Sequence, residues 1–365
     1  MTTLIVVLIL LIMVWLQRFI YRRTWHVGLG FALDFSSDTA SEGDTITLSE
    51  KLDNAKRLPL PWVDVKFQVS RMLVFENSPS VGDSSGRAEL FSVGPGKRVT
   101  RTFNVYCSRR GYYTINGMSV TVSDILKSNS YSMLFSCEQN ITVYPSSIPY
   151  DSFSPIYRMI MGTVRTRRFI NPDPFEFRGI REYQPTDSLR AVNHKATAKT
   201  GELMVNIFTP TASQRVTIWL GTDPYSSHPL DELYEAAIKL AATLAEQLIG
   251  DGLTVELRSG ARNILSPGQC IYVPGGAGPA HLPRLLEALA LADLTAEPEP
   301  ISEVMKNAPE LDSVHILISA YDGEEVGLSC ERFSVEGQDV FWILPRMYGA
   351  PKRVAESDVR FYWDV

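Results

Sequence analysis

The amino-terminal residues constrain this chain most, because they form an apolar run that is unstable in water. Leu4–Leu16 contains no charged side chain, and with its flanks the segment reaches about 20 residues, the length of a helix that crosses a bilayer. Arg18, Arg22 and Arg23 follow the run, so the positive-inside rule places the rest of the chain in the cytoplasm. A cleaved signal peptide would carry its basic residues first and a small-residue cleavage site afterwards. Neither is present, and the sequence predicts a retained, single-pass transmembrane anchor at residues 1–23.

Residues 24–149 carry the pattern of short β-strands. Apolar and polar side chains alternate with period two, as expected for strands that bury one face. Turn clusters such as Ser41–Asp44 and Gly94–Gly96 separate the alternating segments. The clearest strand segments are Thr45–Ser49, Val63–Val69, Val99–Tyr106 and Met118–Val122. Short strands with frequent turns predict an all-β sandwich similar to an immunoglobulin or fibronectin module.

Residues 150–212 combine a connector with the most structured polar stretch of the sequence. Ser146–Pro174 is predicted to be a polar connector interrupted by prolines. Within the stretch Phe177–Phe208, the segment Gln184–Asp187 predicts a turn, because proline restricts φ and aspartate bonds to nearby amides. Asp187 would then cap a helix over 188–199, followed by a strand over 202–208.

The expected helix has two stripes. Leu189, Val192 and Ala196 share an apolar one, while Arg190 and His194, four residues apart, share a polar one.

Residues 213–365 alternate strands with helices. The expected strands are 216–220, 254–257, 314–319 and a final one at 339–344, and the expected helices are 231–248, 281–291 and 300–306. This alternation predicts a mostly parallel sheet covered on both faces, a Rossmann-like α/β domain. The whole chain is therefore predicted to be an α+β protein with several domains.

The stretch 179–199 resembles the signature of the bacterial family catalogued as domain of unknown function 58, roughly G-L-R-E-Y-x-P-G-D-D-x-R-x-I-D/N-W-K-x-S/T-A-R. The matching positions are Gly179, Arg181, Glu182, Tyr183, Pro185, Asp187, Arg190, Asn193, Lys195, Thr197 and Ala198. The departures are Thr186, Ser188, His194 and Lys199. The resemblance implies a von Willebrand factor type A-like domain at the carboxyl end of the chain. It also implies partnership with a MoxR-type AAA+ ATPase and association with a transglutaminase-like membrane protein.

A type A domain that binds Mg²⁺ does so through D-x-S-x-S after its first strand, since this hard cation prefers oxygen ligands. Gly221, Asp223 and Tyr225 occupy those positions here, with Asp322 from a later loop as a further acid. We therefore expect no intact metal site and no cofactor. Nor do Cys107, Cys137, Cys270 and Cys330 show a zinc-binding or redox spacing.

Charge argues against nucleic-acid binding, because the net charge of the chain is −6. Residues 158–199 nevertheless carry nine Lys or Arg against four Asp or Glu, a local charge of +5. A basic patch on an acidic body suggests an acidic protein partner or a phosphate-bearing ligand, or simply a solvated face.

Three functional hypotheses follow. The first is a non-catalytic adaptor in the bacterial inner membrane that contacts an AAA+ ATPase. Its predicted partner-binding residues are Arg178, Arg181, Glu182, Asp187, Arg190, Asn193, His194 and Lys195. The alternative is a hydrolase or transferase in which Asp187, His194 and Lys195 act as acid, base or nucleophile. The third is ligand sensing, in which the basic patch binds an anionic lipid headgroup near the membrane.

Overall fold

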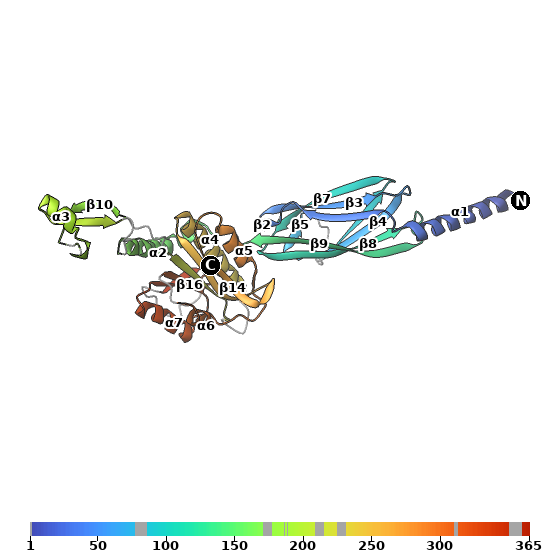
Figure 1. The fold of residues 1–365 in the computed structure, drawn as a ribbon. Coiled ribbons are helices and arrows are strands. Elements are labelled where there is room, and N and C mark those ends of the chain that lie inside the picture. The colour runs from blue at the N-terminus through green and yellow to red at the C-terminus, as the bar shows by residue number, and fades with distance from the viewer. Residues whose placement is uncertain are drawn as a thin grey trace. The chain divides into compact units, whose positions relative to one another are not determined.

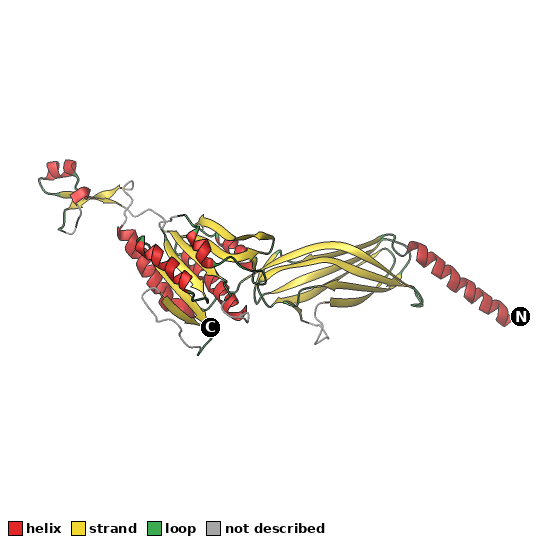
Figure 2. Cartoon of the chain, turned by 90° about the horizontal axis from the view of Figure 1, so that it is seen from below, coloured by secondary structure: helices red, strands yellow, loops and turns green. Residues whose placement is uncertain are grey.

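The computed structural model describes residues 2–76, 86–170, 177–185, 187, 189–208, 215–224, 231–309, 313–349 and 360–365. The chain forms two compact units, Met1–Ser146 and Ser147–Val365. Figure 1 labels many of the elements of each unit along the chain, and Figure 2 distinguishes helices from strands. The protein is of mixed α and β structure with an apolar helix at its amino terminus, which confirms the predicted class at that level.

The first unit begins with helix α1 (Thr2–Thr24), whose apolar side chains are largely exposed. Its segment Thr3–Thr24 is long and apolar enough to cross a membrane, by length and composition. Trp15 stacks on Phe19 with ring centroids 5.7 Å apart. The predicted apolar helix is thus present.

Two β-sheets make up the rest of the first unit. One contains, in spatial order, β1 (Leu29–Phe35), β3 (Thr45–Asn54), β7 (Lys97–Cys107) and β5 (Leu73–Phe75). The other contains β2 (Thr39–Ser41), β9 (Ser130–Tyr144), β8 (Gly111–Ser123), β4 (Leu60–Gln68) and β6 (Gly86–Val93). All pairs are antiparallel except β2 with β9.

Alternating side chains of both sheets form one apolar core. Leu48 and Leu52 of β3, Val65 of β4 and Val120 of β8 are fully buried in it. Two sheets that enclose a shared core make a β-sandwich, as the period-two pattern predicts. The structure extends the predicted strands at one or both ends.

The second unit is built on a seven-stranded sheet. Its strands are β14 (Ser266–Gly276), β13 (Thr254–Asn263), β12 (Arg215–Gly221), β16 (Val314–Ser319), β17 (Val340–Arg346) and β18 (Arg360–Asp364), with β15 (Ala292–Asp293) paired to β13. Strands β12, β13, β16, β17 and β18 run parallel, while β14 and β15 are antiparallel to β13.

Helices cover both faces of this sheet (Figure 1). They are α4 (Asp231–Gly250), α5 (Leu282–Ala290), α6 (Ile301–Lys306) and α7 (Glu324–Val335). Helices α6 and α7 pack with Trp219, Leu317 and Trp342 in one apolar cluster, while α4 contacts four of the parallel strands. The prediction of a mostly parallel sheet covered on both faces is confirmed.

Helix α2 (Tyr150–Ile170) contradicts the predicted connector over 146–174. Pro155 lies near its start and removes one backbone hydrogen bond. An apolar stripe with helical spacing offsets that loss, and all its members are buried: Phe153, Ile156, Tyr157, Ile160, Met161 and Val164. The Tyr157 hydroxyl donates to Asp251 at 2.6 Å, and Trp363 Nε1 donates to the Ser152 carbonyl at 3.2 Å. The helix therefore belongs to the packed α/β unit.

Four further described elements of this unit were not predicted. Strands β14 and β15 pair with β13, helix α7 covers the sheet, and β18 follows β17, so the strand predicted at 339–344 is not the last one.

Candidate functional site

The stretch that carries the family signature folds as a small unit, here called the signature unit (residues 177–208). Strands β10 (Phe177–Glu182) and β11 (Met204–Phe208) form an antiparallel pair in which Arg181 lies opposite Val205. Val205 is buried, and Val192 adds an isolated bridge to it from the connecting segment. The strands thus form a platform for the polar residues between them.

An ion pair holds the first turn of the signature unit. Arg181 Nη1 and Nη2 donate to Asp187 Oδ2 and Oδ1, each at 2.6 Å. The Gln184 amide donates to the same carboxylate at 2.8 Å, and the Asp187 amide donates back to the Gln184 carbonyl at 2.8 Å. The hydrogen bond from Arg181, followed by that from Gln184, lowers the pKa of Asp187, so the carboxylate stays ionised. The predicted turn over Gln184–Asp187 is confirmed.

The continuous helix predicted over 188–199 is wrong. A 3-10 turn η1 (Leu189–Ala191) is followed by a bridge at Val192 and then by helix α3 (His194–Thr200). The chain leaves the helical path because Val192 pairs with Val205, and the predicted apolar and polar stripes therefore do not form. Asn193, rather than Asp187, caps the helix, since its Oδ1 accepts from the Ala196 amide at 2.9 Å.

Two signature residues, Asn193 and Thr197, fasten α3 to the strands. Asn193 Nδ2 donates to Asn206 Oδ1 at 2.7 Å, and Thr197 Oγ1 accepts from the Met204 amide at 3.0 Å. Gly201 ends the helix with φ of 79°, in the left-handed region that favours glycine. Arg181, Asp187, Asn193 and Thr197 thus act within the signature unit, where they define its shape.

The remaining predicted partner-binding residues differ in position. Glu182, His194 and Lys195 are exposed to solvent. The backbone at Arg178 and Arg190 belongs to β10 and η1, and their side chains lie outside the described residues. Among the six predicted residues whose side chains are described, the structure therefore separates three shape-forming ones, Arg181, Asp187 and Asn193, from three solvent-facing ones.

The geometry of the three candidate catalytic residues does not resemble an active site. Both carboxylate oxygens of Asp187 are engaged by Arg181, and one of them also by Gln184. His194 and Lys195 are neighbouring, exposed side chains on the first turn of α3. A general base needs a side chain within hydrogen-bond reach of its partner and a site that excludes water.

The suggested magnesium position at the end of β12 does not fit a metal either. Gly221 approaches Ser319 so closely that a Cβ there would lie 2.6 Å from the Ser319 hydroxyl. Asp223 is buried, and its Oδ1 accepts from the Ile301 amide at 3.0 Å. Burial raises the pKa of this carboxyl, which disfavours the charge that a cation requires. Tyr225 lies outside the described residues, and within the described ranges no three His, Cys, Asp or Glu side chains form a group suited to a metal.

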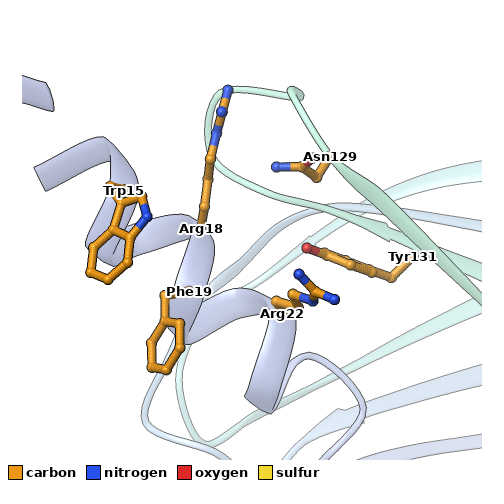
Figure 3. A pocket seen from close by; sticks show the side chains of 6 residues that line it. All are labelled: Trp15, Arg18, Phe19, Arg22, Asn129 and Tyr131. Atoms are coloured by element: carbon orange, nitrogen blue, oxygen red, sulfur yellow. The ribbon is translucent and has the colours of Figure 1, made fainter. Parts of the chain in front are cut away.

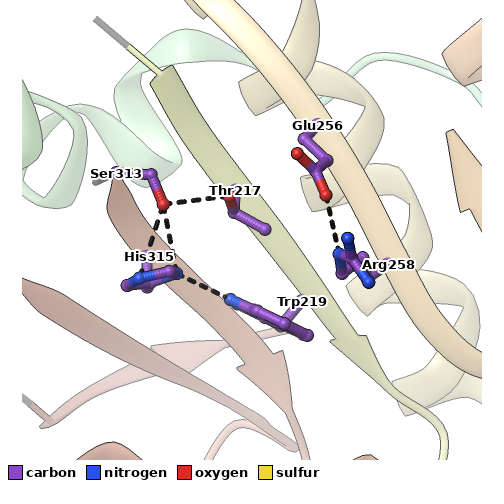
Figure 4. Close-up of polar contacts among 6 residues, drawn as sticks. All are labelled: Thr217, Trp219, Glu256, Arg258, Ser313 and His315. Atoms are coloured by element: carbon purple, nitrogen blue, oxygen red, sulfur yellow. Dashed lines mark hydrogen bonds and ion pairs between the residues drawn. The ribbon is translucent and has the colours of Figure 1, made fainter. Parts of the chain in front are cut away.

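A buried polar network in the second unit was not anticipated from the sequence (Figure 4). Trp219 Nε1 donates to His315 Nδ1 at 3.1 Å, so the neutral imidazole carries its proton on Nε2, where Gln338 Oε1 accepts at 2.5 Å. The ring stacks on Phe333 with centroids 4.3 Å apart. Ser313 bonds to both Thr217 and His315. Because His315 is 1% exposed, this network supports the core rather than a reaction.

Its neighbour on β13 is the ion pair between Glu256 and Arg258, with Oε1 and Nε 2.6 Å apart (Figure 4). The Arg258 guanidinium also lies 4.5 Å from the centre of the Tyr272 ring. The pairing of β12 with β13 brings Glu256 beside Thr217, which a single sequence does not reveal.

Comparison of the sequence with curated proteins finds no match. Among solved structures, the chain is similar to the CARDB domain of a Pyrococcus furiosus protein, solved with di-metal ions, with 15% identity, a TM-score of 0.22 and coverage of 32% of this chain and 94% of that one. A non-cellulosomal cohesin from Archaeoglobus fulgidus is similar with 12% identity, a TM-score of 0.24 and coverage of 31% of this chain and 90% of that one. A cohesin module from a family 33 glycoside hydrolase of Clostridium perfringens is similar with 9% identity, a TM-score of 0.25 and coverage of 33% of this chain and 98% of that one.

At these scores the structural likeness adds nothing to the strand pairing described above. The sequence match is more specific. Residues 179–318, from β10 of the signature unit to β16 of the sheet, match the family described as "Protein of unknown function DUF58".

Proposed function

We propose that this protein is a non-catalytic, membrane-anchored adaptor whose signature unit contacts a MoxR-type AAA+ ATPase. The adaptor would present that unit during the assembly or remodelling of envelope or enzyme complexes. A transglutaminase-like membrane protein is the second proposed partner, by the same family resemblance.

One observation carries the proposal. Arg181, Asp187, Asn193 and Thr197 bond to one another, to Asn206 or to the local backbone, so an external contact would be made by other side chains of the unit. The exposed side chains of the unit include the charged or polar Glu182, His194 and Lys195 and the apolar Ile180, Leu189 and Leu203. Apolar side chains surrounded by charges are typical of protein-binding surfaces.

Three further features support the adaptor. Helix α1 has the length and composition of a membrane span, and Arg18, Arg22 and Arg23 at its carboxyl end favour a cytoplasmic body in the inner membrane. The parallel sheet with helices on both faces is compatible with a von Willebrand factor type A-like domain. Gly221, which has no side-chain ligand, and the buried Asp223, whose Oδ1 accepts from the Ile301 amide, favour a type A-like domain that has no magnesium site and acts as a scaffold.

Affinity capture of the membrane-extracted full chain tests the proposal. Arg190→Ala/Lys195→Ala should abolish recovery of the AAA+ ATPase, because it removes two positive charges from the signature unit. The matched control is Arg158→Ala/Arg284→Ala, which removes two exposed positive charges from α2 and α5. Mass spectrometry then compares ATPase recovery among wild type, variant and control.

Retained ATPase recovery in the Arg190→Ala/Lys195→Ala protein, with an unchanged melting curve, would refute the proposed contact. Equal loss in the control would show that general charge, rather than the signature unit, determines binding.

A further inference from the structure

The end of the β-sandwich nearest α1 is fastened to the last turns of that helix. The Tyr21 hydroxyl donates to the Pro59 carbonyl at 2.5 Å. Lys56 Nζ donates to the carbonyls of Thr24 and Trp25 at 3.0 and 2.5 Å, where helix carbonyls have no intrahelical partner. These bonds hold the loop between β3 and β4 against the point where the helix ends. This end of the sandwich therefore faces whichever surface the helix emerges from.

A recess of about 490 Å³ lies between α1 and the start of β9 (Figure 3). The helix contributes four residues at the spacing of one face: Trp15, Arg18, Phe19 and Arg22. The sandwich contributes Asn129 and Tyr131, whose amide and hydroxyl groups point toward the helix in Figure 3. The recess thus has a cationic and hydrogen-bonding part beside an aromatic part.

The polar part of the recess has the chemistry of a phosphate site. Arg18 and Arg22 are both exposed, and a guanidinium binds phosphate oxygens through two parallel hydrogen bonds. Tyr131 is held in place because its ring stacks on Trp25, with centroids 5.6 Å apart and planes 16° from parallel. Its hydroxyl is a further donor toward the same space.

The acidic side chain of the turn between β8 and β9 is buried among donors of the same turn. Asp124 is 1% exposed and accepts from the amide and hydroxyl of Ser128 at 2.7 and 2.8 Å and from Asn129 Nδ2 at 3.2 Å. Its carboxylate is therefore turned inward and satisfied. The outer side of the turn instead carries Lys127, whose Nζ lies 4.1 Å from the centre of the Trp62 ring.

The same turn exposes apolar side chains beside these cations. Ile125 and Leu126 are 51% and 56% exposed. Apolar side chains next to Lys and Arg, with Trp and Tyr alongside, are typical of protein surfaces that lie in the headgroup layer of a membrane. A soluble anion would not need the apolar wall of Trp15 and Phe19, whereas a lipid fills both parts of the recess.

We propose that this recess binds the phosphate headgroup of an anionic phospholipid, with Arg18, Arg22 and Tyr131 at the phosphate and the acyl chains along Trp15 and Phe19. The site rests on the proposed insertion of α1 in a membrane. It attaches the β-sandwich to the bilayer surface and so limits the tilt of the unit relative to its anchor.

Native mass spectrometry of the full chain in non-ionic detergent tests the site with dioctanoyl phosphatidylglycerol as the probe. We expect bound phosphatidylglycerol to exceed bound dioctanoyl phosphatidylcholine at equal concentration. Arg18→Gln/Arg22→Gln should weaken phosphatidylglycerol binding by about 25-fold, at about fivefold for each arginine. Tyr131→Phe retains both charges and the ring, and should weaken binding through the lost hydroxyl alone.

The matched control is Lys66→Gln/Arg71→Gln, which removes one positive charge from the last residues of β4 and one just after the strand, and should leave binding unchanged. Equal binding of the two lipids, or equal loss in the control, would overturn the site. Inorganic phosphate that displaces phosphatidylglycerol at equal concentration would assign the recess to a soluble anion and overturn the lipid. Carbonate extraction of membranes separates the two proposals: release of the wild-type protein would refute the anchor, whereas retention without phosphatidylglycerol binding would refute only the site.

Discussion

Helix α2 offers a sharp test of the packing described above, because two adjacent residues on it differ in burial. Ile160 is fully buried, whereas Met159 is 39% exposed. Ile160→Ala removes apolar contacts and leaves a cavity, which costs about 2–5 kcal/mol. Met159→Ala removes a side chain that is partly in water and substitutes the best helix former, so its cost stays within about 0.5 kcal/mol.

Hydrogen exchange is the appropriate assay, because a chain with two compact units does not unfold in one two-state step. In Ile160→Ala, we expect amide protection in α2 to fall by roughly 30-fold or more, which follows from 2 kcal/mol at 1.4 kcal/mol per factor of ten. Protection should also fall near Asp251 and Trp363, which are hydrogen-bonded to α2. Equal protection in the two alanine variants would refute the packing of α2 against the α/β unit and restore the predicted connector.

Three other predictions concern buried groups. His315→Phe keeps a ring for stacking but leaves the Trp219 N–H without an acceptor, so exchange in β12 and β16 should report a loss of about 1–3 kcal/mol. Burial raises the pKa of Cys330 from about 9 to about 12, which lowers its thiolate fraction roughly a thousandfold. Iodoacetamide at pH 8 should therefore modify the half-buried Cys137 before Cys330. Modification of Cys330 in the folded protein at a rate comparable to that of Cys137 would contradict this burial. Burial raises the pKa of Asp223, so ionisation of this carboxyl opposes folding. Asp223→Asn should therefore stabilise the unit at pH 7, and this gain over the wild type should disappear as the pH falls to about 4. A melting temperature below that of the wild type in the presence of Mg²⁺ would instead indicate a metal site.

Elements whose apolar side chains recur with the period of one helix or one strand were predictable from the sequence. Elements in which proline, glycine or polar residues interrupt that spacing were not. The apolar stripe of α4 and the alternation of β3 and β4 each match one template. Strand β14 contains prolines and glycines, which a sheet accepts at its edge, where β14 lies, but which suggest loop in a sequence. Helix α2 has apolar side chains at helical spacing, but Pro155 and the polar residues around it indicated a connector instead.

Long-range pairing determines what remained unpredictable at the candidate site. The break between η1 and α3 depends on the bridge from Val192 to Val205, thirteen residues away, and local helix propensity does not include that contact. The network around His315 likewise requires β12 and β16 to be neighbours, which brings Trp219 within 3.1 Å of a residue 96 positions away.

The division within the signature unit decides which substitutions are informative about function. Arg181 and Asp187 hold the turn, and Asn193 holds the start of α3, so replacing any of them changes the shape of the whole unit. Loss of a partner after such a change would follow from either a lost contact or a lost fold. Lys195 is exposed on α3, which makes it a position where the surface changes while the scaffold is retained. If Lys195→Glu abolishes partner binding while Asp187→Asn only weakens it in proportion to unfolding of the unit, the shape-forming residues act through the scaffold and the exposed face makes the contact.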